Sequence, residues 1–185
     1  MYRIMGNETL VQDCIAEFSR HGFVLAEMIA SGNVFHRCLD KSSGQQTGYS
    51  KTIGSGSDHH MHFSHSNLFD QCRVENSFFA ARWMNLGSSP IHGLTAVHSV
   101  YWNLISNGSQ AYAVETQQGR YGYVIGTSGN KPEVNTSALY SGTEFITDPV
   151  DYVEGIKKGK TLVPQSLYLD QKNRRISKPK KSLSQ

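Results

Sequence analysis

Histidines gather in one part of this sequence, and they are the residues with the clearest chemical potential. All eight lie between positions 21 and 98, and four fall in the segment SDHHMHFSH. Imidazole transfers protons near neutral pH, and a neighbouring arginine can neutralise an acidic sugar. The candidate catalytic residues of this cluster are Asp58, His59, His60, Arg20 and His21. His92, in the insertion LGSSPIHG, is a candidate substrate-binding residue.

The same side chains have two other interpretations. They could hold loop corners through hydrogen bonds to the backbone, or His59, His60 and a neighbour could bind zinc. The spacing matches no familiar zinc signature. No metal and no cofactor is therefore expected.

Carboxylates and one arginine are the next candidates. Hydrolysis of a glycosidic bond requires two carboxyl groups at a defined separation. Four acids are available, but spacing distinguishes no pair among them: Asp58, Asp70, Glu75 and Glu115. Asp70 is expected to face solvent. Arg82, which ends the segment FFAAR, is the best-placed base for a lyase reaction.

Three further residues are candidates for substrate binding. Trp102 could stack on a sugar ring, although packing in the core is the commoner fate of an aromatic side chain. Glu115 and Arg120 could line the same groove, or they could stabilise a turn.

The elements that must position these residues are indicated by an internal repeat. The segment GNVFHRC at 32–38 returns as SNLFDQC at 66–72, and looser copies are LVQDC, VYWNL and YVIGT. Their last letters fall at 14, 38, 72, 104 and 127, so the steps are 24, 34, 32 and 23 residues. A recurring step of this size is typical of stacked-repeat proteins. Because the runs are short, rich in Val, Phe and Tyr, and separated by Gly, Asn and Ser, they predict strands and turns without helices.

These features predict an all-β fold, a short right-handed parallel β-helix with inserted loops and an irregular C-terminal cap. In such a solenoid one slot keeps one residue type, because like side chains stack between successive coils. The five strands are expected at 10–14, 34–38, 68–72, 100–104 and 123–127, parallel and in register. Cys14, Cys38 and Cys72 fill one slot and are expected to be buried, reduced thiols.

The order of these segments resembles the pectin-lyase-like β-helix superfamily. The resemblance rests on SRHGFVL, GNVFHRC, DHHMHFSHSNLFDQC, HGLTAVHSVYWNL and GYVIGTSG, and it covers roughly residues 7–130. More narrowly, the chain is similar to uncharacterised C-terminal β-helix domains of bacterial polysaccharide-processing proteins. The superfamily includes lyases, hydrolases, epimerases and non-catalytic spike or adhesive modules, so the resemblance implies a fold more than an activity.

Composition divides the chain into a body and a basic tail. Residues 171–185 hold six Lys or Arg and no acid, and without them 12 basic and 15 acidic residues remain. The body has no basic stripe with interleaved aromatics, so no nucleic-acid partner is expected. No apolar run approaches the roughly 20 residues that span a bilayer, and the start of the chain does not resemble a signal peptide.

The expected organisation is parallel coils over 1–147, a cap over 148–170 and a flexible basic tail over 171–185. The N-terminal coil has little to cover it, so we expect it to be frayed or to pack against another copy, and to continue into further coils in a longer secreted chain. The expected location is extracellular or at the cell surface. The predicted function is a module that binds or processes a polysaccharide, with lyase and glycoside hydrolase activities both open. The alternative is a non-catalytic structural or oligomerising module.

Overall fold

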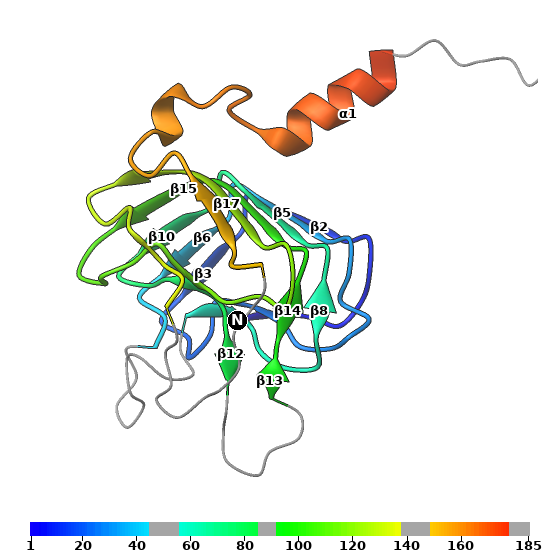
Figure 1. Ribbon diagram of the computed structural model, residues 1–185, viewed down its shortest axis with the longest axis vertical. Helices are drawn as coiled ribbons and strands as arrows, with labels where there is room; N and C mark the ends of the chain where they lie inside the picture. The colour runs from blue at the N-terminus through cyan, green and yellow to red at the C-terminus, as the bar shows by residue number, and fades with distance from the viewer. Residues whose placement is uncertain (45–55, 85–91, 138–148, 178–185) are drawn as a thin grey trace, which may run out of the picture.

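The structure is a computed structural model that describes residues 1–44, 56–84, 92–137 and 149–177, and it consists mainly of short strands stacked in parallel (Figure 1). Residues 45–55 and 85–91, which belong to the expected inserted loops, lie outside the described residues, as do 138–148 and the end of the basic tail, 178–185. One six-stranded sheet, here called sheet A, contains β1 (Tyr2–Ile4), β4 (Phe23–Leu25), β7 (Ser57–His59), β11 (Phe79–Ala81), β16 (Val114–Thr116) and β18 (Val134–Asn135).

Sheet B forms the other large wall of the solenoid. One run of its strands contains β2 (Leu10–Gln12), β5 (Val34–His36), β9 (Leu68–Asp70), β15 (Val100–Asn107), β17 (Tyr123–Gly129) and β19 (Tyr152–Glu154). A second run joins the first at β15 and contains β3 (Ile15–Glu17), β6 (Leu39–Lys41) and β10 (Arg73–Glu75). A small parallel pair is β8 (Ser64–His65) with β14 (Ala96–Val97), and an antiparallel pair is β12 (Trp83–Met84) with β13 (Gly93–Leu94).

The predicted parallel β-helix is confirmed by the pairing of the repeated segments. Successive first residues face one another in parallel register: Leu10 with Val34, Val34 with Leu68, Leu68 with Val100, and Val100 with Tyr123. The repeat in the sequence is therefore a repeat of one strand on successive coils.

Each coil bends at residues in the left-handed backbone conformation. One column of such corners follows the repeated strand and contains Asp13, Arg37, Gln71, Asn103 and Gly126, with φ between +51° and +74°. This conformation costs a residue other than glycine about 1–2 kcal/mol. Hydrogen bonds between coils help to offset that cost, since the amides of Asp13, Arg37 and Gln71 donate to carbonyls of the next coil at 2.9–3.0 Å. The corner explains why the seven repeated letters end in a polar residue followed by Cys.

An asparagine ladder joins the coils just before the same strand. The Asn33 side chain accepts a hydrogen bond from the amide of Thr9 at 2.9 Å, and the Asn67 side chain accepts one from the amide of Asn33 at 3.1 Å. Both side chains are fully buried. Because buried polar groups need partners, the repeated Asn is a structural requirement of the turn.

The core contains a column of aromatic rings. Phe35 stacks on Phe69 with ring centroids 4.6 Å apart, and Phe69 stacks on Tyr101 at 4.9 Å. These three residues follow one another at the same inward position of β5, β9 and β15. Side chains of one kind thus stack along the solenoid, as the repeat predicts.

The three cysteines are free thiols, but only two are buried as expected. Cys38 and Cys72 are fully buried, and their thiols contact the carbonyls of Val11 and Phe35 in the preceding coil at 3.4 and 3.2 Å. Cys14 is half-buried, so its expected burial is wrong. Its thiol contacts the carbonyl oxygen of Gln12 in its own coil at 3.3 Å, and β2 and β3 beside it are edge strands in the part of the chain that the structure describes.

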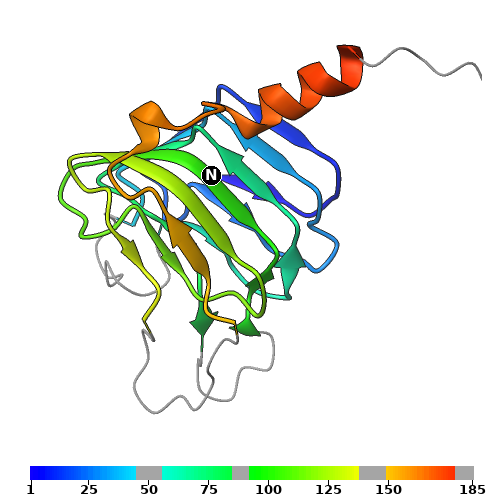
Figure 2. The same ribbon diagram turned by 45° about the horizontal axis from the view of Figure 1, so that its top comes forward.

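The C-terminal segment is more regular than the expected cap. After β19 it forms a 3₁₀ turn, η1 (Gly159–Thr161), and an exposed helix, α1 (Leu167–Ser177), which sequence analysis did not anticipate. Figure 2 shows that this segment runs from the last coils toward the first strands, and α1 lies beside Leu10 and Val34 of β2 and β5. Among the described residues, no helix is long and apolar enough to cross a membrane.

Asp70 shows how this segment is attached, and it corrects the expectation that Asp70 faces solvent. The Asp70 carboxylate is fully buried and accepts hydrogen bonds from the Ser166 hydroxyl, from the Leu167 amide at 3.0 Å and from His36 Nδ1 at 3.0 Å. Ser166 also caps α1, because its hydroxyl accepts the Leu169 amide at 3.1 Å. We call residues 162–168 the C-terminal strap.

Candidate functional site

Asp58 is the centre of the candidate site, and β7 determines its orientation. Its neighbour His59 packs inward against Phe69 and Tyr101, so alternation along the strand turns Asp58 to the outer face of sheet A. Laterally it lies between Val24 of β4 and Ala80 of β11. Although it faces outward, Asp58 is only 2% exposed.

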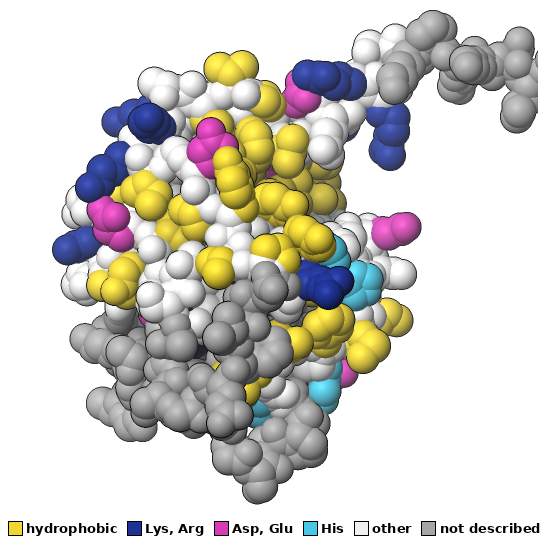
Figure 3. Space-filling view, viewed as in Figure 1, with side chains coloured by type: hydrophobic (Ala, Val, Ile, Leu, Met, Phe, Trp, Pro, Cys, Tyr) yellow, Lys and Arg dark blue, Asp and Glu magenta, His cyan; other side chains and the backbone are white. Residues whose placement is uncertain are grey.

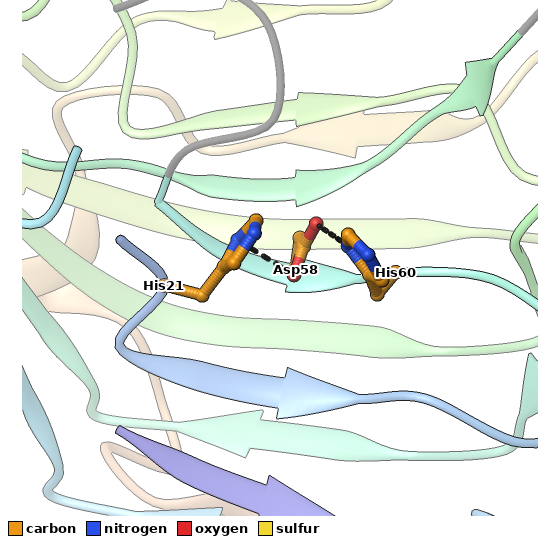
Figure 4. Close-up of side chains that lie close together, drawn as sticks. All are labelled: His21, Asp58 and His60. Atoms are coloured by element: carbon orange, nitrogen blue, oxygen red, sulfur yellow. Dashed lines mark hydrogen bonds and ion pairs between the residues drawn. The ribbon is translucent and has the colours of Figure 1, made fainter. Parts of the chain in front are cut away.

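Two histidines enclose the Asp58 carboxylate (Figure 4). His21, two residues before β4, places Nδ1 3.2 Å from Asp58 Oδ1, and His60, directly after β7, places Nδ1 3.0 Å from Oδ2. His21 Nδ1 is also 3.2 Å from the carbonyl oxygen of Gly56. Both Nδ1 atoms face only acceptors, so each carries the proton that it shares with the carboxylate. We call these three residues the Asp58 cluster.

The two imidazoles keep Asp58 ionised. Burial by itself would raise the pKa of this carboxyl, but hydrogen bonds and charge from His21 and His60 outweigh burial and lower it well below its usual range. A buried carboxylate that is stabilised in this way can orient an imidazole and stabilise its charged form. The side chain of His60 is 20% exposed, so it is the member of the cluster that solvent can reach.

His59 was a candidate catalytic residue, and the structure places it on the opposite side of the strand. It is buried, its Nδ1 lies 2.6 Å from the Ser64 hydroxyl, and burial lowers its pKa to about 4, against a smaller opposing effect of Asp58. His59 is therefore neutral at physiological pH and belongs to the core. His59 and His60 are adjacent in sequence but face different environments.

Arg82 and Glu115 form a second charged pair on the outer face of sheet A. Arg82 follows β11 and Glu115 is the middle residue of β16; Arg82 Nη1 lies 3.0 Å from Glu115 Oε2. Arg82 is buried and its guanidinium lies 5.4 Å from the centre of the Phe78 ring. Burial raises the pKa of Glu115, and the positive charge of Arg82 opposes this rise.

His92 lies at the border of the Asp58 cluster. The rings of His60 and His92 meet edge to face with centroids 5.8 Å apart. Burial, followed by the charge of His60, lowers the pKa of His92, while Asp58 opposes this effect. Arg20 is exposed and directly precedes His21. Figure 3 shows histidine side chains along one side of the molecule.

The remaining candidates lie elsewhere. Trp102 is in sheet B, where its indole N–H donates to the carbonyl oxygen of Pro164 in the C-terminal strap at 3.0 Å. Arg120 lies at a separate cavity of about 440 Å³ lined by Phe63, His65, Leu94, Val97, His98 and Gly119. The structure thus brings together His21, Asp58, His60 and His92, but it separates them from Trp102.

A relation between two carboxylates was missed in the sequence. Ala80 pairs with Asp58 on one side and with Glu115 on the other, so both acids occupy the same outward position two strands apart. The signal was present in the segments SDH, FAA and VET, which are equivalent strands of successive coils. The strands of sheet B carry repeated letters, whereas the strands of sheet A do not, so the letters alone do not align the two acids.

The chain matches no known protein family, no curated protein and no solved structure.

Proposed function

We propose that this chain is a pectin-lyase-like β-helix module that hydrolyses glycosidic bonds of a polysaccharide on the outer face of sheet A. The observation that carries the proposal is the placement of Asp58 and Glu115 at equivalent positions on either side of Ala80. Adjacent strands lie about 4.8 Å apart, so the backbones at the two positions are separated by about 9.6 Å, and the side chains that project from them fall in a similar range. Inverting glycosidases hold their carboxyl groups about 6.5–9.5 Å apart to admit one water molecule.

The two sides of this site suit opposite roles in proton transfer. Glu115, whose pKa is raised by burial, is the general acid, and it gives its proton to the glycosidic oxygen as the bond to the anomeric carbon breaks. The Asp58 cluster is the general base. A water oxygen attacks the anomeric carbon, and the proton lost by that water passes to this cluster. The products are two shorter sugars, one with a new reducing end.

The neighbouring residues position these groups. Arg82 fixes the Glu115 carboxyl through the 3.0 Å ion pair, and His21 holds Asp58 from the side opposite His60. We assign contact with the sugar near His60 to His92, whose ring meets that of His60, and to Arg20, which is exposed directly before His21. The proposed location is extracellular, as part of a longer secreted chain, because polysaccharides are met outside the cell.

The test is a degradation screen with neutral and acidic polysaccharides. Hydrolysis produces new reducing ends, whereas a lyase reaction produces an unsaturated sugar that absorbs ultraviolet light. On a substrate that is cleaved, Glu115→Gln should lower kcat by about 10²–10⁴-fold, the usual contribution of a general acid. Replacing His60 with Ala should abolish turnover while the melting temperature stays within a few degrees.

Glu75→Gln is the matched control, because Glu75 is a half-buried acid on β10 of sheet B. It should leave turnover unchanged. Unsaturated products would show that the reaction is elimination, as in a lyase, and would contradict the proposed hydrolysis. Full activity of Glu115→Gln would contradict the proposed site. So would a His60→Ala variant that loses stability but whose folded fraction turns over substrate at the normal rate.

A second candidate function is a non-catalytic, oligomerising module. It is favoured by the apolar side chains exposed on the first coil: Leu10 is 47% exposed, Ile15 58% and Phe18 65%. Binding of a polysaccharide without turnover, or no binding at all, would support this candidate over hydrolysis.

A further inference from the structure

The Asp58 cluster contains a compact set of donors for a metal ion. One donor atom from each of His21, Asp58 and His60 lies within 4.8 Å of the other two. The two nitrogen–oxygen distances of 3.2 and 3.0 Å approach the roughly 3.3 Å between donors that are about 2.0–2.1 Å from a tetrahedral zinc ion. The donor atoms lie up to 4.8 Å apart, so binding would require the imidazoles to move toward one another and to release the protons that they share with the carboxylate.

Two buried atoms of this cluster are poorly satisfied as hydrogen-bonding groups. Among the described residues, the buried Nε2 of His21 has no hydrogen-bond partner, and Oδ1 of Asp58 has only the ion pair with His21 Nδ1 at 3.2 Å. His21 itself is only 5% exposed. An unsatisfied buried polar atom costs about 1–3 kcal/mol, and coordination of a cation would remove this cost.

We propose that His21, Asp58 and His60 together bind one divalent first-row transition-metal ion, with zinc as the best match. Imidazole nitrogen is a poor ligand for calcium and magnesium, which prefer oxygen, whereas two imidazoles and a carboxylate suit zinc. Three protein ligands leave a fourth position for water, as in catalytic zinc sites. His60 is partly exposed and gives the ion a path from solvent.

The strands make this site rigid. Asp58 is the centre of β7, His60 follows that strand directly, and His21 precedes β4, which pairs with β7 in parallel. Ligands on adjacent strands keep their spacing, because the ladder of backbone hydrogen bonds fixes it. The backbone of β4 and β7 therefore does not need to move when the ion binds.

Bound metal would give the base side of the proposed hydrolysis a defined nucleophile. A zinc ion lowers the pKa of its bound water to about 7, so the water that attacks the sugar could be held and activated there. This role rests on the proposed function. Metal binding itself does not, because it is measured without a sugar.

The experiment is calorimetric titration of the chelator-treated chain with Zn²⁺, together with the absorption spectrum after addition of Co²⁺. We expect one ion per chain and a Co²⁺ spectrum of nitrogen and oxygen ligands without a thiolate band. His60→Ala should weaken binding by more than the roughly 10–100-fold that follows loss of an outer-shell partner. Asp58→Asn provides a second ligand variant, with folding checked by circular dichroism.

His98→Ala is the matched control, because His98 is exposed and stacks on Tyr121 outside the cluster. It should bind as tightly as the unchanged chain. Equal binding by folded His60→Ala, a thiolate band from Cys14, or no saturable binding would each overturn the metal site. Hydrolysis that persists in chelator while Zn²⁺ does not bind would reject the metal and leave the proposed function standing. Metal binding without any turnover would support the metal site and reject the proposed hydrolysis.

Discussion

The thiols of Cys14, Cys38 and Cys72 have equivalent positions in three coils but differ in exposure. Burial raises the pKa of Cys72 well above its ordinary value, so this thiol stays protonated and unreactive. A bulky thiol reagent should label Cys14 in the native protein, whereas Cys38 and Cys72 should react only on unfolding. Mass spectrometry of labelled peptides over time measures the order in which the three cysteines react. Rapid native labelling of Cys72 would contradict the stacked column.

Replacement of Cys38 by Ser tests the same column by its stability. A hydroxyl at this fully buried position must find a partner among mostly apolar neighbours, so the free energy of unfolding should fall by roughly 1–3 kcal/mol. Denaturant titration measures the change. Cys14→Ser is the control and should have a much smaller effect, because Cys14 is half-buried.

At the scale of elements, the C-terminal strap depends on one serine. Ser166 donates to buried Asp70 and caps α1, so Ser166→Ala should cost about 1 kcal/mol and loosen the helix. Hydrogen exchange should rise across 166–177 before the coils exchange. The fluorescence of Trp102 should change as well, since its N–H is bonded to Pro164. Unchanged exchange in α1 would show that other contacts hold the strap.

The turn that precedes β19 should give the protein a pH-dependent stability. Burial raises the pKa of Asp151, against hydrogen bonds from Thr116 and the amides of Gln118 and Gly122. The folded state therefore holds this proton more tightly than the unfolded state. Its stabilising contribution is complete below the ordinary value of 3.8 and is lost as the pH rises through the raised pKa.

Asp151→Asn removes this titration while it keeps the shape of the side chain. Relative to the variant, the unchanged protein should lose stability as the pH rises from below 3.8, and the difference should become constant above the raised pKa. Chemical denaturation at several pH values measures it. A difference that grows in the opposite direction would show that Asp151 is stabilised as the anion.

At the scale of the whole molecule, β2 and β3 are edge strands of sheet B within the described residues, and they carry exposed apolar side chains. Because unpaired strand edges favour association, we expect the protein to self-associate through β2 and β3 as its concentration rises. Ile15→Lys, which places a charge on this edge, should shift the protein to monomer in sedimentation experiments. Val163→Lys is the control, because Val163 is 88% exposed in the strap. A native protein that stays monomeric at every concentration would contradict this edge contact.

The whole fold could be predicted more fully than the site. The sequence predicts parallel stacking because Asn, an aromatic residue and Cys recur at the same positions of the repeat. In the structure, equivalent residues of successive coils are in contact. The histidine cluster was also readable, but the division between inward His59 and outward His60 depends on the phase of one three-residue strand. The contact of Asp70 with Ser166 joins residues 96 positions apart, and no local pattern encodes such a contact.

The column of Phe35, Phe69 and Tyr101 has an optical consequence. Rings stacked 4.6 and 4.9 Å apart in a fixed, asymmetric environment couple their electronic transitions, so they should produce a strong near-ultraviolet circular dichroism signal. The contribution of the stacked rings reports whether successive coils are in contact, whereas Trp102 fluorescence, measured in a Trp83→Phe variant because the chain has two tryptophans, reports the strap that crosses them. The chain thus contains two independent spectroscopic reporters, and the order in which they change during unfolding would show whether the strap detaches before the coils separate.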